Sequence, residues 1–294
     1  MISTEQKQKI AAAIAADFRN FAGSEAQHSV KIGIGASVYN RIKKGETEKV
    51  LNDSKWISIA RQLGVELTGA GEWKAAKTPV FLYVQTQLEF CQTNHCGQVL
   101  CDEAGIGKTF AAVDYARRTK DVIYVDCSIY KSKSQLIRYM SQMLGLDYTA
   151  RLKDVEADLV YTLKNVLAEP LVILDEGGDL HYEAFLELKA LWNATEGYCG
   201  WYMMGADGLR EKLRRGIVNK RVGFAEIFDR LGANTKKIVP ETVKEREAFH
   251  ATQAALVIKA NAPEGADIRQ MIAGADGHLR RVAIEVKKLN RQAA

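Results

Sequence analysis

The chain has 294 residues, of which 47% are hydrophobic and 26% are charged, an ordinary globular composition that allows a real core to form. It contains no run of about eighteen apolar residues, which excludes a membrane-spanning helix, and its first residues are too polar for a secretion signal. We therefore expect a cytoplasmic protein without a membrane partner. The formal net charge of +5 permits a nucleic-acid partner without requiring one.

Residues 1–67 are expected to form a small helical domain. Ser3 and Ser24 are each followed three residues later by a glutamine, which is the spacing of a capping box at the start of a helix. A Gly-Ile-Gly turn at 33–35 is expected to end the second helix. A third helix is predicted from Ala36 to Lys44, and Asp53 is expected to cap a fourth.

A short helix, a glycine-containing turn and a second short helix form the helix-turn-helix arrangement. The stretches 34–42 (IGASVYNRI) and 59–65 (IARQLGV) resemble the Cro/repressor-type helix-turn-helix family. In that family the second helix enters the DNA major groove, so the resemblance implies that its polar side chains contact DNA. These side chains are Ser37, Tyr39, Asn40 and Lys43. The alternative is a small helical bundle that binds protein or binds nothing.

The rest of the chain has the pattern of an α/β protein. Segment 68–79 is small, polar and ends in proline, which predicts a linker or an exposed arm. Residues 80–241 alternate between short apolar runs and helical patterns, which predicts a parallel sheet with helices on both faces. The expected strands are Gln98–Cys101, Val122–Val125, Leu171–Leu174, Trp201–Met204 and Lys237–Val239. Only helices are expected from 242 to 294, as a lid after the core.

The strongest motif is the segment DEAGIGKT at 102–109, which follows an expected strand and precedes an expected helix, as a phosphate-binding loop requires. Two glycines let consecutive N–H groups face phosphate oxygens at the helix N-terminus. Lys108 is expected to reach the β- and γ-phosphates of ATP, and Thr109 to offer its hydroxyl to Mg²⁺. The expected nucleotide-binding residues are Asp102, Glu103, Ala104, Gly105, Ile106, Gly107, Lys108 and Thr109.

This loop departs from the usual pattern at its first position, where Asp102 stands in place of glycine. Aspartate tolerates left-handed backbone better than most residues, so the turn can survive. Its carboxylate must then point away from the phosphates. The alternative is a glycine-rich turn without a ligand.

A second motif is the apolar strand 171–174, which ends in Asp175 and Glu176. Acids at the carboxyl end of a central parallel strand are expected beside the phosphate loop. Asp175 is expected to hold Mg²⁺ through its water shell. Glu176 is expected to act as the general base that activates the attacking water.

The phosphate loop, the acidic strand end, a further strand and a helical lid together resemble the AAA+ ATPase family. The resemblance implies three further site residues: a polar group after the fourth strand, an arginine that reaches the ATP of a neighbouring subunit, and a lid arginine that follows a glycine. The matching positions are Asp207, where asparagine or threonine is commoner, Arg230, with Arg221 as the alternative, and Arg280.

An N-terminal helix-turn-helix joined to one small AAA+ module, with the short stretch 209–224 before Arg230, resembles the phage Mu B transposition protein family. In that family ATP-bound subunits form a helical filament on DNA and stimulate a transposase, and hydrolysis disassembles the filament. The resemblance implies double-stranded DNA, a transposase and further copies of the chain, in a filament or a ring, as partners. A helicase-loader-like ATPase and an ATP-gated helix-turn-helix transcription regulator stay open as alternatives.

Two basic clusters are candidates for a DNA path, because phosphate contacts give sequence-independent, salt-sensitive affinity. Lys131 and Lys133 follow the second expected strand. The second cluster includes Arg214 and Arg215 within the stretch 210–221. The alternative for both clusters is a solvated protein surface.

Three of the five cysteines, Cys91, Cys96 and Cys101, are evenly spaced, and His95 lies beside Cys96, which raises the question of a zinc site. The two-residue spacing of zinc motifs is missing, and Cys91 and Cys101 lie in a helical and a strand pattern. We therefore favour buried, reduced thiols.

Overall fold

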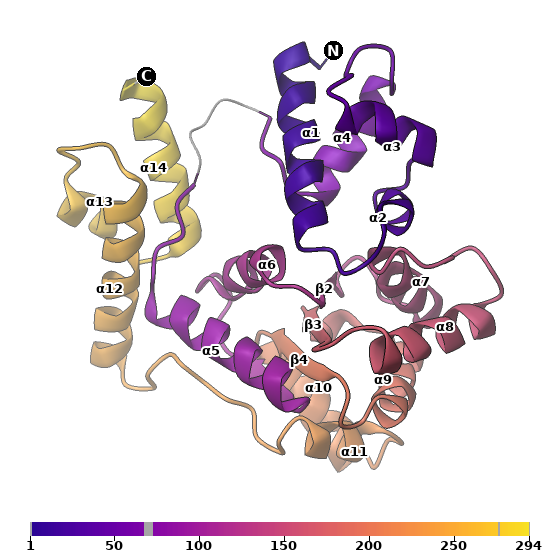
Figure 1. The fold of residues 1–294 in the computed structure, drawn as a ribbon. Helices are drawn as coiled ribbons and strands as arrows, with labels where there is room; N and C mark the ends of the chain where they lie inside the picture. The colour runs from indigo at the N-terminus through magenta and orange to yellow at the C-terminus, as the bar shows by residue number, and fades with distance from the viewer. Residues whose placement is uncertain (1, 68–72, 276, 294) are drawn as a thin grey trace.

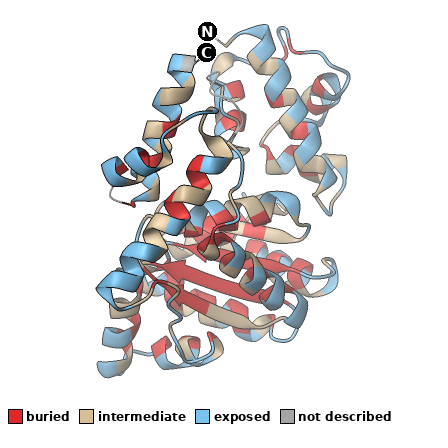
Figure 2. Ribbon diagram, turned by 90° about the vertical axis from the view of Figure 1, so that its left-hand side faces the viewer, coloured by how far each residue is buried: buried red, intermediate tan, exposed pale blue. Residues whose placement is uncertain are grey.

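The computed structural model describes residues 2–67, 73–275 and 277–293. Its centre is a parallel four-stranded sheet with the strand order β1-β4-β3-β2 (Figure 1). The strands are β1 (Gly97–Cys101), β2 (Val122–Asp126), β3 (Leu171–Asp175) and β4 (Gly200–Gly205). The two central strands, β3 and β4, are buried along their whole length (Figure 2). Such burial is typical of parallel strands covered by helices on both faces.

The strand expected at 237–239 does not form. A single parallel bridge joins Leu100 of β1 to Lys236 instead. Slightly further along the chain, the N–H groups of Ile238 and Val239 donate to the carboxylate of Asp102. Because a side chain takes these donors, the segment does not continue the ladder along β1.

Two hydrophobic clusters lie on opposite faces of the sheet. Alternate residues of β3 serve the two clusters: Val172 and Leu174 belong to one, and Leu171 and Ile173 to the other. Helices α7 to α11 cover the first face, and α5 and α6 cover the second. The helices of this region are α5 (Pro79–Asn94), α6 (Lys108–Arg118), α7 (Lys133–Met143), α8 (Leu152–Asn165), the short 3-10 helix η1 (Gly177–Asp179), α9 (Tyr182–Ala194), α10 (Asp207–Val218) and α11 (Phe224–Arg230).

The N-terminal region has four helices with a hydrophobic cluster of their own. They are α1 (Thr4–Arg19), α2 (Glu25–Lys31), α3 (Ala36–Lys43) and α4 (Asp53–Gln62). Both predicted capping boxes, at Ser3 and Ser24, are confirmed. The cap of α4 is Asn52, whose side chain accepts the N–H of Lys55, so the prediction of Asp53 as the cap is wrong by one residue.

Helix α3 follows α2 after the glycine turn at 33–35, and it carries the four predicted DNA contacts. Ser37, Asn40 and Lys43 are exposed. Tyr39 is only 5% exposed, and its hydroxyl lies 2.9 Å from Nδ1 of the buried His28. The prediction of Tyr39 as a DNA contact is therefore wrong, because its ring belongs to the core of this region.

The C-terminal region is formed by α12 (Val243–Asn261), α13 (Ile268–Ala275) and α14 (Leu279–Ala293), which share a further hydrophobic cluster. Trp73 packs against this cluster, and the backbone of Lys74 exchanges two hydrogen bonds with the side chain of Asn261. The described part of the expected linker therefore lies along the lid, while 68–72 fall outside the described residues. No helix in the described part of the chain is both long and apolar enough to cross a membrane.

Candidate nucleotide-binding site

The loop between β1 and α6 has the backbone of an anion-binding loop. Gly105 and Gly107 have φ angles of 79° and 103°, in the left-handed region that glycine enters without a steric cost. No side chain caps the start of α6 at Gly107. The first N–H groups of this helix are therefore free to bind phosphate oxygens.

Lys108 lies inside this loop. Its side-chain Nζ donates to the carbonyl oxygens of Asp102 at 2.8 Å and Glu103 at 2.6 Å, and the residue is 6% exposed. Burial lowers the pKa of Lys108, while the nearby carboxylates of Asp102, Glu176 and Asp175 act to raise it. The ammonium group is thus held within the phosphate loop by two of the loop's own carbonyl oxygens.

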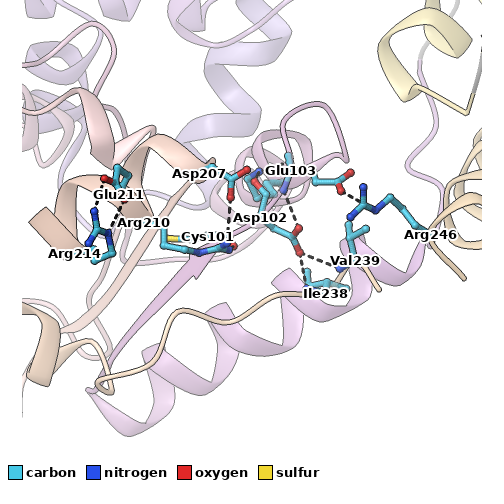
Figure 3. A network of polar contacts seen from close by, with 11 residues as sticks. Cys101, Asp102, Glu103, Asp207, Arg210, Glu211, Arg214, Ile238, Val239 and Arg246 are labelled. Atoms are coloured by element: carbon cyan, nitrogen blue, oxygen red, sulfur yellow. Dashed lines mark hydrogen bonds and ion pairs between the residues drawn. The ribbon is translucent and has the colours of Figure 1, made fainter. Parts of the chain in front are cut away.

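Asp102, the departure from the usual pattern, is fully buried and points away from the loop interior, as expected (Figure 3). Its carboxylate accepts the N–H groups of Glu103 at 2.8 Å, of Val239 at 3.0 Å and of Ile238. The left-handed backbone considered for Asp102 is not adopted. A carboxylate that accepts these backbone donors ties the start of the phosphate loop to the segment 238–239, which leads to the lid.

Two oxygens suited to Mg²⁺ lie side by side at the end of β3. The Thr109 hydroxyl donates to Asp175 Oδ2 at 2.6 Å, and the Tyr124 hydroxyl donates to the same oxygen at 2.8 Å. Asp175 is 2% exposed. Hydroxyl and carboxylate oxygens are ligands that Mg²⁺ prefers, so this donor set fits the metal.

Glu176 follows at the open end of the strand, with a left-handed φ angle of 50°. Desolvation raises the pKa of its carboxyl, and the charge of Asp175 raises it further, while Lys108 acts in the opposite direction. A raised pKa brings a carboxylate closer to the range in which a general base works well at neutral pH.

We expect the acid limb of kcat for ATP hydrolysis to lie above pH 4.5, the ordinary pKa of glutamic acid. The base must be deprotonated, so kcat should fall as the pH drops through the raised pKa of Glu176. The measurement is phosphate release at saturating ATP across this range. Glu176→Asp is the control, since a limb that belongs to residue 176 should move. A limb at or below pH 4.5 would contradict the assignment.

A cavity of about 980 Å³ opens between the phosphate loop, the arm at 73–78 and the lid. Seven of the predicted site residues line it: Ala104, Gly105, Gly107, Lys108, Thr109, Glu176 and Arg280. Ile106 does not, because its side chain is buried in the cluster beneath the sheet.

The sequence analysis missed the apolar wall of this cavity. Its members are Trp73, Phe81, Phe110, Val113, Val257 and Leu279. They come from the arm, α5, α6 and the lid, which no local pattern connects. The one sequence signal for this wall is a phenylalanine, Phe110, directly after the phosphate loop. In the structure its side chain is 41% exposed. Aromatic and aliphatic side chains beside a phosphate loop suit the base of a nucleotide.

Glu103 connects the phosphate loop to the lid. Its carboxylate lies 3.3 Å from Nε of Arg246 and 3.0 Å from Nε2 of His250, both on α12 (Figure 3 shows the Arg246 contact). The predicted nucleotide contact at this position is therefore a lid contact in this structure. We expect a movement of the lid to shift the phosphate loop through the contacts of Glu103 with Arg246 and His250.

Asp207 and Arg230 also lie outside the cavity lining. Asp207 forms an ion pair with Arg210 at 3.1 Å at the start of α10 (Figure 3). Arg230 lies at the end of α11 and donates to the side chain of Asn193 and, at 3.4 Å, to the carbonyl of Glu226. Asp207 lies near the start of the phosphate loop, because the guanidinium of its partner Arg210 also donates to the carbonyl of Cys101. In the described structure, no hydrogen bond joins Arg230 to the loop of its own chain.

The predicted DNA-contacting cations on the core all have acidic neighbours. Lys131 lies 3.4 Å from Asp179. Lys133 pairs with the buried Glu187 and lies 3.7 Å from Glu156. Arg214 and Arg215 share Glu211, at 2.8 and 2.5 Å. Of these acidic partners, Asp179 is the most exposed: its side chain is 48% exposed and that of Lys131 is 42% exposed.

The five cysteines are free thiols, and only Cys96 is not fully buried. Burial raises the pKa of Cys101 to about 12. Within the described ranges, no three His, Cys, Asp or Glu side chains gather as metal ligands would.

Residues 93–213 match the family described as AAA domain. This match, the parallel sheet, the glycine loop at its edge and the acids at the end of β3 all fit an α/β P-loop core.

The chain is similar to proteins of one prophage and two phages. It is 26% identical over 235 residues to the Mu-like prophage FluMu DNA transposition protein B of Haemophilus influenzae, which covers 74% of this chain and 80% of that protein. It is 27% identical over 164 residues to the ATP-dependent target DNA activator B of Escherichia phage Mu, and equally to that of phage D108. These matches cover 54% of this chain and half of each phage protein.

Proposed function

We propose that this chain is an ATP-hydrolysing AAA+ protein that assembles on double-stranded DNA and regulates or stimulates a DNA transposase. The observation that carries the ATPase part is one cavity lined by the phosphate loop, Lys108, Thr109 and Glu176, with Asp175 in contact with Thr109. The names of the similar proteins support the DNA and transposition part.

Each of these groups has a chemical role in the proposal. The loop N–H groups and Lys108 bind the phosphates of ATP, while Thr109 and Asp175 hold Mg²⁺, which neutralises phosphate charge when it is bound. Glu176 accepts a proton from the attacking water. The apolar wall receives the base, and the lid over it excludes bulk water.

Assembly follows from the positions of two arginines. Arg280 lines the cavity of its own chain, so it senses nucleotide in cis. Arg230 lies away from that cavity, which supports a role at the ATP of a neighbouring subunit. ATP placed between two copies then favours their association, in a filament or a ring.

Duplex DNA is proposed to lie along the assembled subunits, with Lys131 as the main phosphate contact. Its partner Asp179 is exposed, and an exposed ion pair contributes only about 0–1 kcal/mol, so a DNA phosphate can compete for the ammonium. Lys133, Arg214 and Arg215 are secondary candidates because each already has a close acidic partner. Ser37, Asn40 and Lys43 of α3 are proposed as further contacts from the N-terminal region.

ATP should strengthen duplex DNA binding strongly, because assembly multiplies the few phosphate contacts of each subunit. Affinity should fall steeply with salt and depend little on sequence. Lys131→Ala should lower both the affinity and the salt slope, without changing nucleotide affinity. Fluorescence anisotropy with ATP, ADP and no nucleotide measures these effects.

Lys164→Ala on α8 is the control, because Lys164 lies over the ring of Tyr198 and has no part in the proposed DNA path. Equal DNA affinity in all three nucleotide states would reject ATP-gated assembly on DNA. Sequence-specific DNA binding by the N-terminal region alone would then favour a transcription regulator.

A further inference from the structure

The chain makes a tight turn directly after Glu176. The N–H of Asp179 donates to the Glu176 carbonyl at 2.9 Å, which closes the 3-10 helix η1. Glu176 itself has a left-handed backbone, which costs a side-chain-bearing residue about 1–2 kcal/mol. Such a conformation persists only where the surrounding structure enforces it, so the direction of the Glu176 carboxylate depends on what holds this turn.

Two glycines let the turn lie flat against neighbouring elements. A Cβ on Gly177 would lie 2.7 Å from Cγ of Met203 in β4, and one on Gly178 would lie 3.2 Å from the backbone N of Leu209 in α10. The turn is therefore packed against β4 and the start of α10.

Lys212 reaches from α10 to the middle of this turn and to the residue that follows it. Its Nζ donates to the carbonyl of Gly178 at 2.9 Å and to the carbonyl of Leu180. The same ammonium lies 5.1 Å from the centre of the Phe185 ring, which supports it from the other side. Sequence alone placed Lys212 in a basic stretch with the DNA candidates, but its charge faces the backbone of the core.

We propose that Lys212 is a positioning residue for the general base Glu176: by bridging the carbonyls of Gly178 and Leu180, it holds the turn that fixes the direction of the Glu176 carboxylate. This inference rests on the proposed ATPase function. Hydrogen bonds from a charged donor contribute more than neutral ones, so loss of the ammonium leaves two partly buried carbonyls without this donor and loosens the turn. The phosphate loop does not contact Lys212, so ATP binding does not depend on it.

Lys212→Met keeps an unbranched apolar stem beside Phe185 and removes the ammonium. We expect kcat to fall by about 10-fold to 10²-fold, since a displacement of about 1 Å in an active site has effects of this size. KM and the dissociation constant for ATP should change less than about twofold. Lys164→Met is the matched control. The ammonium of Lys164 also lies over an aromatic ring, that of Tyr198 at 5.0 Å, but Lys164 belongs to α8 and not to the elements that hold the turn after Glu176.

A double-mutant cycle with Glu176→Gln separates positioning from general damage. Once the base is gone there is nothing to position, so adding Lys212→Met to Glu176→Gln should lower kcat little further. Unchanged kcat in Lys212→Met, an equal loss of ATP affinity, or the same fold-loss in both backgrounds would overturn the proposal. Normal turnover by Glu176→Gln itself would instead reject the assigned base. If Lys212→Met does not fold, Lys212→Gln takes its place in the same cycle.

Discussion

Replacing Glu176 by glutamine should lower kcat for ATP hydrolysis by about 10²–10⁴-fold and leave ATP affinity nearly unchanged. The amide has almost the same shape as the carboxylate but cannot accept the proton of the attacking water. Glu176 lines the cavity without contacting the phosphate loop through any hydrogen bond in the described structure, so binding should survive. Phosphate release and fluorescent-nucleotide binding measure the two quantities separately.

Lys108→Ala provides the opposite pattern, because it removes the buried ammonium at the phosphate loop and should abolish ATP binding. Glu183→Gln, the same substitution at an exposed position of α9, is the control and should hydrolyse ATP normally. Normal hydrolysis by Glu176→Gln would show that another group acts as the base.

Replacing Arg230 by alanine should reduce ATPase activity by about 10³–10⁵-fold, the range for an arginine that stabilises a phosphoryl-transfer transition state. The arginine is proposed to act on the neighbouring subunit, because it lies outside the cavity of its own chain. Mixing Arg230→Ala with Lys108→Ala protein should then restore part of the activity. One interface in the mixture pairs an intact phosphate loop with an intact arginine. ATPase activity against mixing ratio is the measurement.

A fully active Arg230→Ala protein would sink this assignment. Arg221→Ala tests the alternative position, where the guanidinium lies 4.7 Å from the centre of the Tyr182 ring. If both single variants are inactive and mixing restores only one of them, that one supplies the arginine in trans. No recovery in any mixture would argue that neither residue works across an interface.

The sequence by itself determined the elements whose causes are local. The serine–glutamine pairs at Ser3 and Ser24 predicted two helix starts that the structure contains, because a capping box involves residues three apart. The two glycines of the phosphate loop predicted a curled backbone, and both adopt left-handed φ angles, which glycine enters without a steric cost. Four of the five predicted strands exist, since buried parallel strands are short apolar runs.

Only the tertiary structure decided which way polar side chains point. Tyr39 and Lys212 are of types common on surfaces, yet one is buried against His28 and the other bridges carbonyls of a turn more than thirty residues earlier. Asp102 accepts N–H groups from residues 136 and 137 positions further along. This contact takes the place of the fifth strand, and the apolar wall of the cavity comes from five separate segments, namely the arm, α5, α6, α12 and α14. Each of these outcomes depends on groups distant in sequence that compete for the same buried partners, and no local pattern records that competition.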